Sequence, residues 1–272
     1  MTDPIRPLRR ALVAGGLLSL MVFSVPGSAQ DQAGLSDEFS DPGSLSRWIP
    51  YHVAEGWPDH MKRMEVKGGN LELEPWTSGW YAEFHAPFLY KKVAGDFSVT
   101  TRLQARGKAS DLPGATWSLT GLMVRQPPKT GKADWKPGQE NWLFLTTGIA
   151  EEPGKPVFET KTTVNSRSRL KLHPARPGWV ELRIDRAGPT FTLLYRYPGE
   201  DWVTLERFER PDLPREVQVG LNVYTDWYSA RELHEDPLRF NSTVIKEGKP
   251  DLVTLVDYVR FGPAEMLSSA AP

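Results

Sequence analysis

Hydrophobic and polar residues alternate along most of the chain after residue 70. Val180, Leu182 and Ile184 alternate with charged residues, and the run 217–224 alternates in the same way. Because successive side chains of a strand point to opposite faces, a period of two predicts strands with one buried face. The alternating pattern begins at Leu71. The predicted strands include residues 97–103, 119–125, 142–148, 157–164, 169–173, 180–185, 190–197, 202–208, 217–224 and 252–261.

Turn-forming residues separate these strands at hairpin distances, as in the sequence RAGP at residues 186–189. Apart from the N-terminal segment, the sequence shows no 3.6-residue apolar period, so we expect only short helices within loops. Many short strands joined by turns predict an all-β fold, a two-sheet antiparallel β-sandwich of the jelly-roll kind. The 23 glycines, 24 prolines and 10 tryptophans fit this fold, and they leave aromatic residues for a surface site.

Three connections exceed hairpin length, and such loops are usually functional or disordered. They are residues 107–116, 126–139 and 225–251. We expect disorder in the second, which contains the sequence PPKTGK. We expect the third to be ordered, because it carries several aromatic residues.

The N-terminal segment has the pattern of an export signal. Three arginines within residues 6–10 precede an uncharged apolar run over residues 11–25, and small residues follow it. A transmembrane helix needs about 20 apolar residues, so this run is short for one. The sequence predicts a signal peptide at residues 1–29, then a single domain at residues 30–272 in the periplasm or outside the cell. The alternative is an uncleaved N-terminal membrane anchor; the mature domain is not expected to span a membrane.

Composition removes several classes of function. The chain has no cysteine, which excludes disulfides, thiolate metal sites and cysteine nucleophiles. The 33 basic and 34 acidic residues nearly balance, whereas nucleic-acid binders carry a basic excess, so no nucleic-acid partner is expected. The five histidines lie far apart, and we predict no metal site and no cofactor. Calcium held by loop oxygens of Asp226, Asp236 or Asp251 stays open.

Several short motifs are similar to those of one known superfamily. They are DEF at residues 37–39, GNLEL at 69–73, VAGDFSV at 93–99, GLMVR at 121–125, WVELRI at 179–184 and VDYVRF at 256–261. In these motifs the chain resembles the concanavalin A-like lectin/glucanase jelly rolls, and within them the bacterial regulation-of-enolase type of domain. The resemblance implies two stacked antiparallel sheets, the concave face of one holding a carbohydrate. The long connection 225–251 departs from the pattern and would cover or enlarge that face.

Acid pairs for glycoside hydrolysis are not evident in the sequence. Retaining glucanases of this superfamily carry a Glu-x-Asp-x-x-Glu motif on one strand, because hydrolysis needs two carboxylates in one cleft. That motif is absent here. The nearest approximations are Glu72 with Glu74 and Glu181 with Asp185, and we interpret both pairs as solvated surface acids. The sequence therefore assigns no catalytic residue.

An aromatic and polar patch is the best candidate for a binding site. Strand alternation places Val99, Leu122 and Leu143 toward the core, and it turns Trp142 and Tyr224 away from it. Sugar rings stack on such aromatic faces, while Arg and Asp bind their hydroxyls. The plain alternative is that these aromatic residues are buried in a core. The predicted ligand-binding residues are Arg102, Arg125, Trp142, Tyr224, Asp226 and Trp227.

These patterns favour an exported, non-catalytic binding module that recognises carbohydrate through this patch on the concave sheet. The first alternative is a structural or interaction subunit of a bacterial envelope protein complex, which would use the same patch for a protein partner. The second alternative is a glycoside hydrolase or polysaccharide lyase with unrecognised acids.

Overall fold

The computed structural model describes Met1, residues 32–129 and residues 131–264. Apart from Met1, the expected signal peptide lies outside the described residues. Within the described residues, none of the helices is both long enough and apolar enough to cross a membrane.

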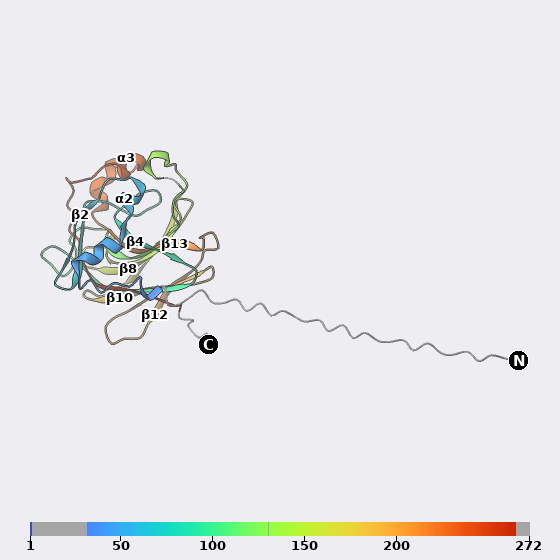
Figure 1. The fold of residues 1–272 in the computed structure, drawn as a ribbon. Helices are drawn as coiled ribbons and strands as arrows, with labels where there is room; N and C mark the ends of the chain where they lie inside the picture. Colours follow the sequence, from blue (N-terminus) through green and yellow to red (C-terminus); the bar gives the residue numbers. More distant parts are fainter. Residues whose placement is uncertain (2–31, 130, 265–272) are drawn as a thin grey trace.

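Two antiparallel sheets of seven strands each form a β-sandwich, as the alternation predicts (Figure 1). The strand order of one sheet is β1-β4-β13-β6-β7-β8-β9; we call it the covered sheet, because loops and short helices cover its outward face. The other sheet, with the order β12-β11-β10-β5-β14-β3-β2, is called the outer sheet. In Figure 1, α2 and α3 lie on the side of the sandwich opposite β10 and β12.

The element bounds agree closely with the predicted strands from residue 97 onward. The strands are β1 (Ile49–Pro50), β2 (Met61–Lys67), β3 (Asn70–Pro75), β4 (Phe88–Ala94), β5 (Phe97–Arg106), β6 (Ser118–Arg125), β7 (Trp142–Ile149), β8 (Pro156–Val164), β9 (Arg167–Pro174), β10 (Val180–Ala187), β11 (Thr190–Arg196), β12 (Val203–Glu209), β13 (Glu216–Tyr224) and β14 (Val253–Gly262). The helices are η1 (Pro42–Arg47), α2 (Tyr51–Glu55), η2 (Lys132–Asp134), η3 (Trp227–Leu233) and α3 (Pro237–Asn241).

Besides the two-residue β1, two strands were not predicted, for different reasons. β4 is buried on both faces: Leu89 packs in the core between the sheets, and Tyr90 packs under the covering loops. Its sequence FLYKKVA begins with three apolar residues that face both sides, and two adjacent lysines follow, so the strand shows no alternation. β2 is a charged strand at the edge of the outer sheet, so its apolar period is weak.

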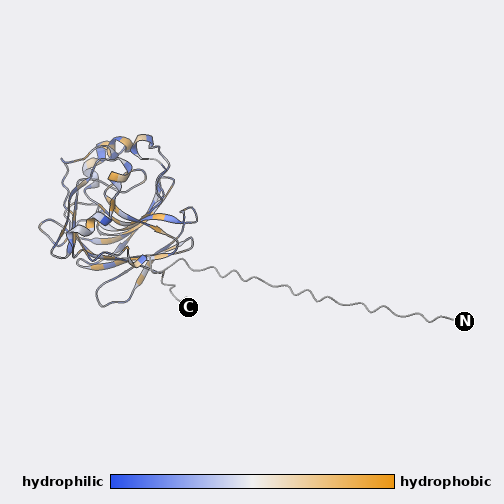
Figure 2. Cartoon of the chain, viewed as in Figure 1, coloured by the Kyte–Doolittle hydropathy of each residue, from blue (hydrophilic) through white to orange (hydrophobic). Residues whose placement is uncertain are grey.

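The main core lies between the two sheets. Val99 and Leu103 of β5 face Leu122, Leu143 and other apolar residues of the covered sheet, all nearly inaccessible to solvent. The faces assigned from alternation are therefore confirmed for these strands. Figure 2 shows apolar positions along the strands of both sheets and also on the short helices.

A second apolar layer lies on the outward face of the covered sheet. Tyr51 of α2 and Trp80 of the segment 76–87 pack there against Met123 and Phe144 of the sheet. Trp135, in the connection 126–139, packs edge-on against the neighbouring Trp57 with ring centroids 6.2 Å apart. The expected disorder is therefore wrong for the described part of that connection.

The connection 225–251 extends the same cover and is ordered, as expected. Phe240 of α3 is fully buried and packs edge-on against Phe84, with ring centroids 5.0 Å apart. The side-chain oxygen of Asn241 accepts a hydrogen bond from the backbone N–H of His85 at 2.8 Å. The long connection is thereby fastened to the segment 76–87.

Candidate functional site

The structure separates the six predicted ligand-binding residues. Arg102 lies on the outward face of β5, in the outer sheet, whereas the other five belong to the covered sheet or the connection that follows β13. Its guanidinium pairs with Asp257 at 2.8 Å and lies over the ring of Trp179 at 4.8 Å. Arg102 therefore does not share a surface with the other predicted residues.

Arg125 and Trp142 lie on the predicted face but are not accessible. Only 1% of Arg125 and 0% of Trp142 is exposed to solvent. Trp142 stacks on Phe144 at 5.2 Å with nearly parallel rings, and Trp80 packs edge-on against it at 6.0 Å. The expectation of an exposed patch centred on Trp142 is wrong, because the covering segments bury the whole middle of this face.

Arg125 forms a buried ion cluster beneath the cover. Its Nε and Nη2 donate to the two oxygens of Glu140 at 3.1 and 3.0 Å, and its guanidinium also binds Glu55. Glu140 in turn contacts Nε2 of His85 at 3.0 Å. Burial alone would lower the pKa of Arg125, but Glu140 and Glu55 raise it well above its usual value. The cluster therefore ties α2, the segment 76–87 and Glu140, which follows the connection 126–139, to strand β6.

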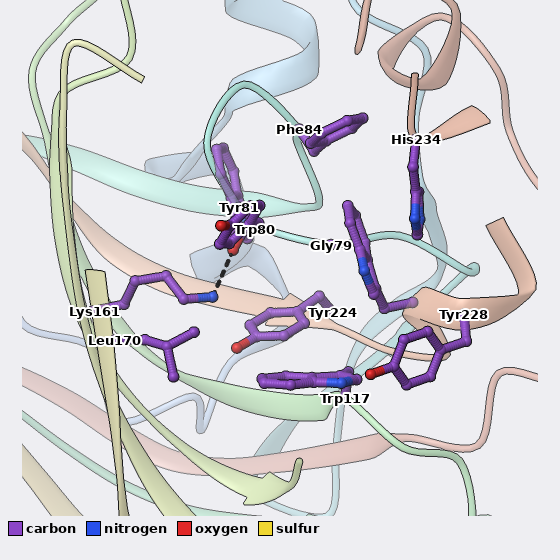
Figure 3. Close-up of a pocket in the computed structure, with 11 residues that line it drawn as sticks. Gly79, Trp80, Tyr81, Phe84, Trp117, Lys161, Leu170, Tyr224, Tyr228 and His234 are labelled. Carbon is purple, nitrogen blue, oxygen red and sulfur yellow. Dashed lines mark hydrogen bonds between the residues drawn. The ribbon is translucent and has the colours of Figure 1, made fainter. Parts of the chain in front are cut away.

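An accessible cavity of about 360 Å³ lies beside this buried region, also over the covered sheet (Figure 3). Tyr224 and Trp227 are the two predicted residues that reach it. Seven of its eleven lining residues are Trp, Tyr or Phe, so we call it the aromatic cavity. The lining residues are Gly79, Trp80, Tyr81, Phe84, Trp117, Lys161, Leu170, Tyr224, Trp227, Tyr228 and His234.

Separate segments bring the aromatic walls together. Trp117 precedes β6 with a φ of +51°, and its backbone N–H donates to Ala150 at 2.9 Å. Trp227 begins η3 and packs directly over Gly79, where a Cβ would lie only 2.2 Å from the indole. Tyr81 and Tyr228 remain 44% and 52% exposed, so these two rings are accessible to a ligand.

Asp226 anchors the cover and does not line the cavity. It is buried, and its carboxylate accepts hydrogen bonds from the hydroxyls of Thr77 and Ser229, both at 2.8 Å. It also accepts from the backbone N–H of Lys249 at 2.5 Å. Asp226 therefore holds both ends of the connection 225–251 against the segment 76–87.

A buried ion pair forms the polar floor of the aromatic cavity. Lys161 of β8 points toward the cavity, with its Nζ 2.7 Å from Glu159 Oε1 and 2.9 Å from the carbonyl oxygen of Trp80 (Figure 3). The hydroxyl of Tyr224 donates to the other oxygen of Glu159. Burial lowers the pKa of Lys161, and Glu159 opposes that shift. Four rings lie 5.0–5.9 Å from the ammonium, those of Phe144, Tyr81, Tyr224 and Trp117.

His234 completes the wall formed by the connection 225–251. Its ring stacks on that of Trp227 at 3.9 Å, and burial lowers its pKa below the usual value, which keeps the imidazole neutral near pH 7. The eleven described residues that line the cavity include no Asp or Glu.

The acid pairs considered in the sequence lie in the outer sheet and are bound to cations. Glu74 is buried and contacts Lys62 at 2.7 Å, and Asp185 is buried and pairs with Arg183 at 2.7 Å. The interpretation as solvated acids is therefore wrong for these two. Glu181 accepts hydrogen bonds from Arg196 and Tyr258.

The three aspartates considered for calcium act separately. Asp236 accepts from the backbone N–H of Arg239 at the start of α3, whereas Asp251 accepts from the N–H of Lys108 and of Gly114. In the part of the chain that the structure describes, no three His, Cys, Asp or Glu residues are grouped closely enough to hold a metal ion.

One signal in the sequence could have led to the floor of the cavity. Glu159 and Lys161 are two residues apart on a predicted strand, so alternation places both on one face of that strand. Only the pairing of β7 with β8 shows that this is also the face of Trp142. Trp117 and the rings of the connection 225–251 carry no such signal, because loop geometry sets their positions.

Comparisons with known proteins place the fold. No known protein family matches this chain, and no curated protein matches it. A functionally unknown protein from Saccharomyces cerevisiae has a similar structure, with a TM-score of 0.56 at 14% identity over 81% of this chain and 98% of that one. A GH43 protein from Bacillus licheniformis has a TM-score of 0.56 at 14% identity, over 84% of this chain and 39% of that one. A xylan β-1,4-xylosidase from Bacillus halodurans has a TM-score of 0.54 at 13% identity, over 84% and 38%. This chain therefore spans well under half of those two enzymes, and at these identities the likeness shows a shared β-sandwich fold.

Proposed function

We propose that this chain is an exported, non-catalytic carbohydrate-binding protein, and that the aromatic cavity is its binding site. Export rests on the N-terminal pattern of basic and apolar residues, and the site replaces the patch expected from the sequence.

The observation that carries the proposal is the composition of the cavity wall. Its volume of about 360 Å³ lies at the lower end of the range for ligand pockets, about 300–1,000 Å³. Trp117, Tyr228 and Tyr81 present aromatic faces, on which the C–H faces of a pyranose ring stack. The ammonium of Lys161 and the phenol groups supply directed hydrogen bonds for hydroxyls. A cavity of this size suits one or two sugar units, for example the end of a chain.

The resemblances support the same ligand class. The strand motifs are similar to those of concanavalin A-like lectins and glucanases, and we place the chain with the regulation-of-enolase type of domain among them. Two structural neighbours are described as a GH43 protein and a xylan β-1,4-xylosidase. Fold alone does not fix function, so the cavity carries more weight than these likenesses.

The surroundings of the cavity support a binding role over hydrolysis. Most glycosidases use two carboxylates placed on either side of the scissile bond. Glu159 is the carboxylate behind the cavity floor, and it is fully buried and engaged by Lys161 and Tyr224.

Titration calorimetry against a panel of mono- and oligosaccharides tests the proposal. Trp117→Ala should weaken binding of the best ligand by about 1–3 kcal/mol, as expected for a stacking anchor. Trp202→Ala is the matched control, because Trp202 is a partly exposed tryptophan that lies under Arg196 at 4.5 Å, away from the cavity. The absence of binding to every glycan would refute the proposal and favour the protein-interaction alternative.

A further inference from the structure

The aromatic cavity has a charge balance that limits which sugars it accepts. Lys161 is the cation that its wall presents, and the Glu159 carboxylate lies 2.7 Å from that ammonium. His234 is neutral near pH 7, and the wall contributes no carboxylate of its own. The floor is therefore an internally compensated ion pair.

Aromatic boxes of this kind also bind quaternary ammonium ligands, because the ring faces attract cations. Here the protein's own ammonium already lies 5.5–5.9 Å from three of the lining rings, those of Tyr81, Tyr224 and Trp117. A second cation in the cavity would meet Lys161 as a like charge. The arrangement therefore disfavours choline-like ligands.

A carboxylate ligand meets a different obstacle. To pair with Lys161 it must approach an ammonium that Glu159 already neutralises, and it must lose its own hydration in a largely apolar cavity. A neutral hydroxyl has a much smaller desolvation cost and still accepts a hydrogen bond from Lys161. An ammonium has three N–H donors. Among the described residues, Lys161 pairs with the Glu159 carboxylate and donates to the Trp80 carbonyl, which leaves a donor for a ligand hydroxyl.

We infer that Glu159 makes the aromatic cavity selective for neutral sugars over sugars that carry a carboxylate. The inference rests on the proposed function and names its ligand class. Glu159 is a specificity-determining residue that acts through Lys161 without touching the ligand.

Paired ligands that differ in one group test the inference. Titrations at pH 6.5 compare the methyl glycosides of glucose, galactose and mannose with the corresponding uronic acids and with the methyl esters of those acids. We expect the neutral glycoside and the ester to bind at least about tenfold more tightly than the acid. The uncompensated charge of the ligand carboxylate is sufficient to produce a factor of this size in a buried site.

Two variants should shift this ratio in opposite directions. Glu159→Gln removes the carboxylate that neutralises Lys161. The carboxylate of an acid ligand can then take its place and stabilise the charged ammonium, so affinity for the acid should rise relative to the neutral glycoside by about tenfold. Lys161→Met removes the ammonium with which the acid could pair, so the acid should be rejected further. A purely structural role would lower both affinities together. Glu209→Gln, which removes a carboxylate from the exposed face of β12, should leave the ratio unchanged.

The outcomes separate the two proposals. Two results would overturn the inference and leave carbohydrate binding intact. In the first, the acids bind the wild-type protein as tightly as their esters do. In the second, Glu159→Gln keeps its circular dichroism spectrum and does not change the ratio of the affinities for the acid and the neutral glycoside. If Glu159→Gln does not fold, the wild-type comparison of acid with ester still decides. A failure of all sugars to bind would refute the proposed function itself.

Discussion

Replacing Trp142 by alanine should damage the fold far more than ligand binding. The indole is fully buried, stacks on Phe144 at 5.2 Å and contacts Trp80 at 6.0 Å. Truncation of a buried tryptophan removes its transfer free energy and leaves a cavity, which together cost about 3–5 kcal/mol. Total stability of a domain is about 5–15 kcal/mol, so this is a large part of it.

Equilibrium unfolding in urea, followed by tryptophan fluorescence and circular dichroism, measures the loss. The midpoint for Trp142→Ala should fall with little change in slope, because the surface exposed on unfolding stays similar. Trp202→Ala, at a partly exposed site, should cost much less. A stable Trp142→Ala protein, with an unfolding loss below about 1 kcal/mol and abolished sugar binding, would refute the burial argument and restore Trp142 as a ligand contact.

The remaining predictions concern pH, packing and processing. Burial lowers the pKa of His60 to about 4. Below pH 7 the unfolded chain therefore binds more protons at this residue than the native protein does. Acidification from pH 7.5 to 4.5 should thus remove about 2–3 kcal/mol of the free energy of unfolding. Urea titrations should show this loss reduced in His60→Gln, and an equal loss in both proteins would contradict it. Gly79→Ala should shift the Trp227 indole, lower the stability by about 1–3 kcal/mol through strain and weaken glycan binding. The control is Gly262→Ala, where an added Cβ meets nothing within 4 Å, and it should change neither stability nor glycan binding. Mass spectrometry of protein from its native host should find an N-terminus near Gln30, and an intact N-terminus would favour a retained anchor.

Alternation in the sequence was sufficient to assign the strands from residue 97 onward and the faces that they turn to the core. Val99, Leu122 and Leu143 were placed toward the core, and they lie there in the structure. The period of two is a local property, because each side chain alternates with its neighbours whatever else the chain does. β4 escaped this reasoning because its first four residues are buried on both faces and its sequence FLYKKVA does not alternate.

The position of the site depended on the loops and short helices that cover the outward face of the covered sheet. Alternation correctly turned Trp142 and Arg125 away from the core, yet three segments distant in sequence cover them through contacts such as Arg125 with Glu55 and Glu140. Arg102 obeyed the same rule but belongs to the other sheet. Alternation gives the side of a strand but carries no information on which sheet it joins.

The sequence by itself therefore determined the all-β class, most strand bounds and the residues that face the core, because these depend on a local period and on turn residues. Only the tertiary structure decided which outward residues reach solvent. The aromatic cavity is assembled from Trp117, Lys161, Tyr224 and two loop segments, whose proximity comes from long-range packing. The selectivity that we infer for it rests on the ion pair between Lys161 and Glu159, whose strength depends on the burial that those segments create.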